Sequence, residues 1–523
     1  MIDRAEKSNR YFVIIVGLTI LLGIFFRFYN LDGKTYWHDE VYSSLRVAGN
    51  NGDIVVEEVF NGKIISPQDL LEYQKVQPGL SWKASLDKFV EHPEHPPLFY
   101  FSLRFWQDIF GSSVTVARSL AAVFSLLVFP GIFWLCWELF ESETVGWIAV
   151  AMTAISPVHI LYAQEARQYS LWAATTLFAS AALIRAMRLD KAQWWGLYAV
   201  NLALSFYTVL LSAYVAIAHA FYVFIVEKFR PTQKLISFAL AGICAVILFI
   251  PWLIVVFKNY ERLKDKTDWT NIARPFIELL ASWELNLNAI FIDIHPAVGL
   301  VTAPRLTPII LFFLGYATYF LYRQTPLKIW LFIVSLVIIP ALGLIIPDLI
   351  PGGQKSIMVR YFMPSVLGIQ IAIAYWLGKE KYAYQKIKIA VASILIVGGI
   401  ISATVSSQTP TWWNKVVGYH NPEIATYANR YDRPLIISNN HDINIGTLIS
   451  LSYLFKPEVR LMLVEKPEVP IIPQGNFSEI LLWNVGATTF NKFKEKNNCE
   501  LERVEENYYP ALWLVKPKNE SIS

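Results

Sequence analysis

Two adjacent carboxylates follow the first apolar segment of the chain. Asp39 and Glu40 lie in the stretch TYWHDEVYSS, shortly after an apolar run at residues 11–28 that is long enough to enter a lipid bilayer. A carboxylate at a membrane surface can act as a general base, which takes the proton of a hydroxyl as that hydroxyl attacks carbon. A solvated loop with aromatic anchors would contain the same residue types. The neighbouring charges therefore decide between the two interpretations.

Two other stretches place charged residues at the ends of apolar segments. Glu165 and Arg167 lie in YAQEARQYS, where a charge is costly unless it is paired, solvated or functional. A local Glu-Arg pair that caps a helix is the alternative there. Lys355 and Arg360 lie in GGQKSIMVRYFMP, at the start of an apolar helix, where cations oppose the helix dipole and need an anionic partner or a path to water. A phosphate fits the forked donors of arginine, so this pattern predicts an anion-binding site.

Histidines form a further group of candidate residues. His92 and His95 lie in EHPEHPPLFY, and His38 precedes Asp39. Imidazole and carboxylate ligands suit several divalent metal ions, so a metal site at His38, Asp39, His92 and His95 is one interpretation. Their spacing matches no fixed metal motif. We therefore favour the interpretation in which His95 contacts substrate or orients Asp39 over the divalent metal, and we predict no cofactor.

The composition is that of a protein with many membrane spans. The chain has 523 residues, of which 55% are hydrophobic and 16% charged, against about 25% charged in soluble domains, and its mean hydropathy is +0.40. A net charge of +4 without a basic cluster excludes nucleic acid as an expected partner. The three cysteines, Cys136, Cys244 and Cys499, indicate neither a disulfide framework nor a metal motif.

About eleven apolar segments are long enough to cross a membrane, and they predict a polytopic α-helical fold. They lie near residues 11–28, 114–137, 144–160, 168–187, 193–208, 209–227, 236–257, 307–322, 328–347, 356–378 and 387–405. Lysine and arginine gather in alternate connecting segments, which predicts a cytoplasmic N-terminus and an outer C-terminus. These cationic segments are residues 185–191, 228–234, 323–328 and 379–388.

The segment 95–111, HPPLFYFSLRFWQDIFG, is apolar enough to resemble a span. A crossing there would place Asp39 and Glu165 on opposite faces of the membrane, so we predict an interfacial helix instead. The first outer loop then covers residues 29–113, and a second outer segment covers residues 258–306.

The character of the chain changes after the last predicted span, from about residue 410. Short apolar runs separated by Pro, Gly, Asn and charged residues predict strands of a small α/β domain. The sequence thus divides into a transmembrane domain at residues 1–405 and an outer domain at residues 406–523. The predicted strands are RPLIISNN, VRLMLVE, SEILLWN and ALWLVKP, with a helix at INIGTLISLSYLF after the first of them.

The order of these pieces resembles the polytopic glycosyltransferases of the C superfamily. The likeness is to the prokaryotic type of the branch that contains protein O-mannosyltransferases and aminoarabinose transferases. It rests on the Asp39-Glu40 pair, on the Pro-Pro segment at 95–111 and on SVTVARSLAAVFSLL after it, and further along on SPVHILYAQEARQYSLW and VRYFMP. These pieces lie in order between residue 11 and about residue 405.

The resemblance implies an enzyme that transfers a mannose-like hexose, or another hexose or pentose, from a polyprenyl-phosphate carrier. The acceptor would be a protein, a lipid or a glycan, and transfer would invert the anomeric carbon. It implies a bacterial plasma membrane protein with its site on the periplasmic or extracellular face. Asp39 would be the base, with Glu40 beside it and Glu165 as the second acid, and no metal would be essential, because many relatives of this branch work without one. The residues expected to bind lipid phosphate or sugar are Arg360, Lys355, Arg167, His95 and Tyr361.

Two departures separate this chain from the aminoarabinose enzymes. His95 stands where they have a lysine before Pro-Pro-Leu, and Val41 and Tyr42 stand where they have an arginine. Both argue against aminoarabinose transfer to lipid A. A transporter or flippase for lipid-linked sugars is the alternative function. Such proteins usually place polar sites near the bilayer midplane, often between repeated halves, whereas the candidate residues here gather at one surface.

Overall fold

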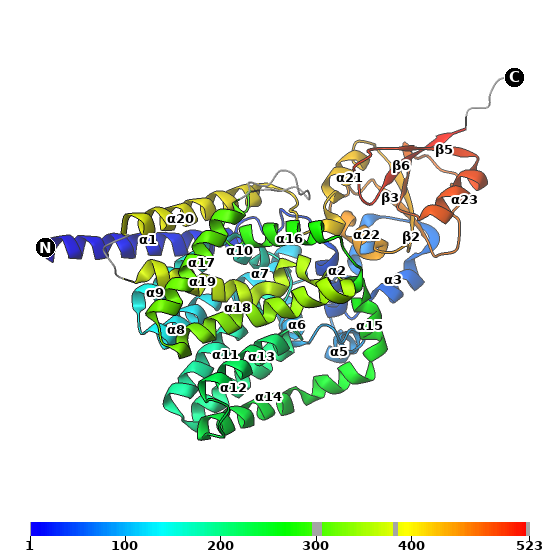
Figure 1. Ribbon diagram of the computed structural model, residues 1–523. Helices are drawn as coiled ribbons and strands as arrows, with labels where there is room; N and C mark the ends of the chain where they lie inside the picture. The colour runs from blue at the N-terminus through cyan, green and yellow to red at the C-terminus, as the bar shows by residue number, and fades with distance from the viewer. Residues whose placement is uncertain (1, 295–305, 380–384, 519–523) are drawn as a thin grey trace.

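The computed structural model describes residues 2–294, 306–379 and 385–518. Two predictions fall partly outside these residues: Lys381 of a cationic segment, and residues 295–305 of the second outer segment. The chain forms a bundle of long helices with a mixed sheet at one end (Figure 1). The N-terminus lies at the opposite end of the bundle from the sheet (Figure 1).

The described residues contain seven helices that are long and apolar enough to cross a membrane. The count is eight if the bent pair α9 and α10, which meet at 60°, forms one span. These segments are built from α1 (Ile2–Phe28), α7 (Val114–Leu126) with α8 (Val128–Phe140), α9 (Glu143–Ile155) with α10 (Pro157–Ala163), α11 (Tyr169–Leu189), α14 (Gln233–Lys258), α18 (Leu327–Pro347), α19 (Met363–Gly378) and α20 (Gln385–Gln408). This architecture fits a polytopic membrane protein, as the sequence predicts.

Three further predicted spans form helices that fall outside this set by length or composition. They are α12 (Ala192–Thr208), α13 (Ser212–Val226) and α17 (Thr307–Gln324). The number eleven therefore stays a prediction. The predicted interfacial segment forms α6 (Leu98–Phe110), whose 13 residues extend for about 20 Å, too short for a hydrocarbon core of about 30 Å.

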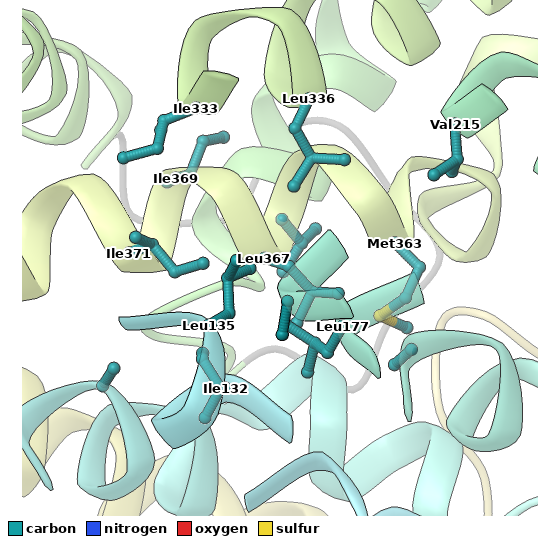
Figure 2. Packing of buried hydrophobic residues seen from close by; sticks show 14 of the residues in the cluster. Ile132, Leu135, Leu177, Val215, Ile333, Leu336, Met363, Leu367, Ile369 and Ile371 are labelled. Carbon is teal, nitrogen blue, oxygen red and sulfur yellow. The ribbon is translucent and has the colours of Figure 1, made fainter. Parts of the chain in front are cut away.

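Helix α19 lies at the centre of the largest buried cluster. Figure 2 shows Leu367 and Ile371 of α19 between Ile333 of α18 on one side and Leu135 of α8 on the other. Close packing supplies the attraction between helices in lipid, where hydrophobic burial contributes little. A Cβ at Gly368 would lie 2.6 Å from a methyl carbon of α18, so this glycine permits the close approach of α18 and α19.

The first outer loop folds into short helices before α6. They are α2 (His38–Val47), α3 (Gly52–Val59), α4 (Pro67–Glu72) and α5 (Trp82–Val90). In the second outer segment, α14 continues into α15 (Tyr260–Thr267), and α16 (Phe276–Asn288) follows. Helix α2 packs against α5, α6 and α22, and so lies between the bundle and the sheet.

Within the described residues the sheet has six strands, in the order β1-β3-β2-β4-β6-β5. The strands are β1 (Asn61–Ile65), β2 (Pro434–Asn439), β3 (Arg460–Val464), β4 (Glu479–Trp483), β5 (Cys499–Arg503) and β6 (Leu512–Pro517). Strands β2, β3 and β4 are parallel, and the other pairings are antiparallel. Helices α21 (Asn421–Ala428), α22 (Asn444–Ser452) and α23 (Ala487–Asn497) complete this region.

Four of these strands and helix α22 lie where the sequence predicts them, and two strands were not predicted. β5 has the short, charged sequence CELER, in which only Cys499 and Leu501 are apolar. β1 is a short edge strand with a bulge between Asn61 and Ile64 and a left-handed Gly62, and it comes from the first outer loop. The first outer loop and the C-terminal region therefore share one sheet.

Candidate active site

The two adjacent acids open helix α2. Trp37 is extended at the N-cap, and its N–H donates to Glu40 Oε2 at 3.3 Å. Acids in a first helical turn are stabilised by the helix dipole, which is why the helix begins here. Consecutive residues on a helix point about 100° apart. Asp39 and Glu40 therefore face different surroundings.

Asp39 faces two buried arginines. Its carboxylate lies 3.6 Å from Arg360 Nη2 and 4.0 Å from Arg167 Nη2, and its side chain is 25% exposed. Arg167 is held in place because its Nη1 donates to the Asp39 carbonyl and to Ser43 Oγ, each at 3.2 Å. Burial raises the pKa of Asp39, but Arg167 and then Arg360 lower it, and the net pKa lies below its usual value. Asp39 is thus ionised at neutral pH and reachable from solvent.

Arg360 lies in the short helix η4 (Val359–Phe362) that leads into α19. Its guanidinium carbon is 5.4 Å from the ring centroids of Trp37 and Tyr361 and 5.8 Å from that of Tyr169. Aromatic faces hold a guanidinium without consuming its N–H donors. Its Nε, like that of Arg167, has no hydrogen-bond partner among the described residues. Donors therefore remain available for an anion.

A third arginine, Arg46, lies two turns after Asp39 on α2 and was not predicted. Its Nη2 is 4.0 Å from Glu94 Oε1, which also accepts from His92 Nδ1 at 3.3 Å and lies 3.8 Å from His95 Nε2. Burial, Arg167 and Arg46 together hold the pKa of His95 well below its usual value, so His95 is neutral. The heptad spacing from Asp39 was the signal in the sequence that would have revealed Arg46.

Glu40 is completely buried and its oxygens are occupied. Arg118 donates from Nε and Nη2 to its two oxygens, each at 2.7 Å, and Ala166 N–H donates at 2.9 Å. Lys415 Nζ lies 3.4 Å from the same carboxylate. Burial raises the pKa of Glu40, but Arg118 and Lys415 lower it below its usual value. Glu40 is thus an ionised carboxylate with no surface for substrate.

Glu165 belongs to the same buried network. Its Oε1 accepts from Asn414 Nδ2 at 2.7 Å and from Lys415 Nζ at 3.1 Å. The Glu165 side chain is 1% exposed. It therefore lies in the protein interior, although it belongs to the same turn as Arg167. The sequence indicated neither Lys415 nor Asn414. Arg118 had a detectable signal, since a charge inside an apolar segment requires a partner.

Lys355 has other contacts. It opens η3 (Lys355–Ile357), where its Nζ donates to Asn271 Oδ1 at 3.2 Å and its backbone N–H donates to Asp348. Among the contacts of the described residues, none joins Lys355 to Asp39. The predicted pairing of Lys355 with Arg360 at one phosphate therefore has no direct support in the geometry.

The described part of the chain contains no group of three or more His, Cys, Asp or Glu side chains that could hold a metal ion. The four alternative ligands are accordingly not assembled. His38 packs its ring against Tyr42, with centroids 5.0 Å apart, while His92 turns to Glu94.

Comparisons with known proteins agree with this architecture. Residues 94–255, less than half of the chain, match the family model described as dolichyl-phosphate-mannose-protein mannosyltransferase. The apo structure of ArnT from Cupriavidus metallidurans aligns with a TM-score of 0.55 at 10% identity, covering 98% of this chain and 99% of ArnT. ArnT bound to undecaprenyl phosphate aligns with a TM-score of 0.54 at 11% identity, covering 97% and 98%.

A third match is the apo oligosaccharyltransferase of Archaeoglobus fulgidus. It aligns with a TM-score of 0.51 at 11% identity and covers 87% of this chain but 65% of the archaeal one. No curated protein sequence matches the chain. At these identities the structural likenesses show a common fold. The predicted resemblance is confirmed by the family-model match over residues 94–255 and by the fold that the chain shares with ArnT.

Proposed function

We propose that this chain, which has the fold of the polytopic C-superfamily glycosyltransferases, transfers a sugar from a polyprenyl-phosphate-linked donor to an acceptor. The observation that supports this most directly is the environment of Asp39. It is a partly exposed carboxylate flanked by Arg360 at 3.6 Å and Arg167 at 4.0 Å, next to helices that lie in the membrane. The proposed base thus lies within 4.0 Å of both arginines of the proposed anion site.

The arginines bind the phosphate of the donor. Arg360 and Arg167 keep N–H donors that no described residue uses, and charge-assisted bonds to phosphate are among the strongest hydrogen bonds in proteins. The lipid tail extends into the bilayer, which is why the site lies at the mouth of the span α11 and the η4-α19 segment. Tyr361 and Tyr169 line the guanidinium and exclude water from it.

Asp39 removes the proton of the acceptor hydroxyl. The hydroxyl oxygen forms a new bond to the anomeric carbon while the bond from that carbon to the phosphate oxygen breaks. Attack opposite to the leaving phosphate inverts the anomeric carbon. The electron pair leaves with polyprenyl phosphate, whose developing charge Arg360 and Arg167 stabilise. Phosphate is a weakly basic leaving group, so its departure needs no strong acid.

Donor binding also strengthens the base. In the free protein Arg167 and Arg360 lower the pKa of Asp39 and reduce its basicity. A phosphate on the same arginines neutralises their charge and adds a negative charge nearby, and both effects raise a carboxyl pKa. Asp39 therefore becomes a better proton acceptor once the donor is bound.

Glu40 and Glu165 take supporting roles in this proposal. Both are buried and bound by protein donors, so they hold α2 and the turn at Arg167 in register instead of touching the sugar. The sugar donated and the acceptor, a protein, a lipid or a glycan, are set by contacts around Asp39. We place the site on the periplasmic or extracellular face of a bacterial plasma membrane, because the cationic connecting segments define the opposite side.

The test is sugar transfer by the purified full-length protein in lipid vesicles. Synthetic polyprenyl phosphates carrying radiolabelled hexoses or pentoses serve as donors, and a membrane extract serves as acceptor. We expect transfer by the wild type, loss of transfer in Asp39→Asn, and retention in Asp53→Asn, an exposed acid of the same outer loop. Full transfer by Asp39→Asn would refute the assignment of the base. Movement of the donor across the bilayer without transfer would favour the flippase.

A further inference from the structure

Four consecutive residues after α20, Trp412 to Lys415, form hydrogen bonds with residues from other parts of the chain. Trp412 and Trp413 both donate their indole N–H groups to the carboxylate of Asp293, at 2.8 to 3.1 Å. Asn414 donates to Glu165 at 2.7 Å. Lys415 follows and reaches two acids at once. The segment WWNK therefore connects the last span to the second outer segment and to the active site.

Lys415 occupies the centre of this connection. Its side chain is 1% exposed, and its Nζ lies 3.1 Å from Glu165 Oε1 and 3.4 Å from Glu40 Oε2. The same ammonium lies 5.3 Å from the ring centroid of Trp37, the N-cap of α2. A buried ammonium is stable only when paired. Here one lysine bridges the first turn of the helix that carries Asp39 and the turn that carries Arg167.

We propose that Lys415 is a positioning residue, which sets the separation between the base Asp39 and the phosphate-binding Arg167 by bridging Glu40 and Glu165. Asp39 is adjacent to Glu40, and Arg167 is two residues from Glu165. A change in the distance between the two acids therefore moves the base relative to the arginine. For its kinetic readout this inference rests on the proposed function.

The C-terminal region also reaches α2 through a second set of contacts, which involves Tyr453 and Gln74. Tyr453, just after α22, donates to Gln74 Oε1 at 2.6 Å, and Gln74 Nε2 donates to the Val41 carbonyl of α2 at 3.3 Å. The Tyr453 ring also packs against Tyr36, with centroids 5.3 Å apart. Residues after the last span thus contact α2 through both Lys415 and α22. The C-terminal region is a structural part of the catalytic centre.

Lys415→Met tests the proposal, because methionine keeps most of the stem and removes the charge. A misplacement of about 1 Å costs on the order of 100-fold in rate, so we expect kcat to fall by about that factor while KM for the donor stays unchanged. Lys415→Arg restores the charge and should recover most of the rate. Lys492→Met, an exposed lysine of α23, is the matched control.

Hydrogen exchange supplies a readout that does not depend on turnover. Amides of α2 should exchange faster in Lys415→Met than in the wild type or in Lys492→Met. If Lys415→Met does not fold, the double variant Glu165→Gln with Lys415→Met removes both charges and permits the same measurements. An unchanged kcat with unchanged exchange in α2, or no recovery by Lys415→Arg, would overturn the proposal. Absence of transfer by the wild type would instead refute the proposed function, and exchange alone would then decide on Lys415.

Discussion

In the proposed mechanism Asp39 and a bound phosphate compete for the same arginines, so removing the carboxylate charge should strengthen the binding of polyprenyl phosphate. The Asp39 oxygen lies 3.6 Å from Arg360 and 4.0 Å from Arg167, and a phosphate on these guanidinium groups must lie close to it. With an effective dielectric constant of about 20, two negative charges about 8 Å apart repel by roughly 2 kcal/mol.

We therefore expect Asp39→Asn to lower the Kd for polyprenyl phosphate by about tenfold, allowing for partial screening, since tenfold corresponds to about 1.4 kcal/mol. The same variant should lose about 100- to 10,000-fold in kcat, the usual contribution of a general base. Opposite effects on affinity and turnover distinguish this scheme from unfolding, which would reduce both.

The assay is equilibrium binding of polyprenyl phosphate, the product of the proposed reaction, to protein in lipid nanodiscs at neutral pH, which avoids turnover. Asp53→Asn controls for a general change in surface charge, because Asp53 is exposed on α3. Higher ionic strength should reduce the difference between Asp39→Asn and the wild type. Unchanged or weaker binding by Asp39→Asn would show that Asp39 and the phosphate do not share the arginines.

Three further predictions follow from the same contacts. Arg118→Met should lower the free energy of unfolding by about 3–5 kcal/mol, because it leaves Glu40 buried without its main partner. Denaturant titration in mixed micelles measures this, and adding Glu40→Gln should recover part of the loss. Equal stability of the single and double variants would contradict this prediction. The acid limb of kcat/KM should lie below the usual pKa of an aspartate side chain, since Arg167 and Arg360 lower the pKa of Asp39 in the free protein although burial raises it. The acid limb of kcat should lie higher, because bound donor raises the pKa of Asp39; coincident limbs in pH-rate profiles would refute this. Gly446→Ala should reduce kcat by about tenfold, because the added Cβ would lie 2.6 Å from Nδ1 of His38 in α2. Gly242→Ala, which has open space around it, should have no effect. Equal activity of the two variants would exclude α22 as a support for α2.

Local patterns were sufficient to predict most of the secondary structure and part of the candidate site. Long apolar runs predicted the helices of the bundle, and alternation between apolar runs and turn residues predicted four strands, because both signals are contained within a short window. The costs of charge at a membrane surface likewise indicated Asp39, Arg167 and Arg360. The structure brings these three residues together.

The family resemblance implies that Asp39 is the base, but only the tertiary structure shows how differently the two neighbouring acids are surrounded. Asp39 and Glu40 are adjacent carboxylates of similar chemistry, but a rotation of about 100° on α2 turns Asp39 to solvent and Glu40 into the interior. The partners of Glu40 come from residues 118, 166 and 415, and β1 pairs with a strand about 400 positions later. Pairings at such separations depend on how the helices pack, which no local window records. The sequence by itself therefore determined which residue types stand at the membrane surface, and the packing determined which of them is free to react.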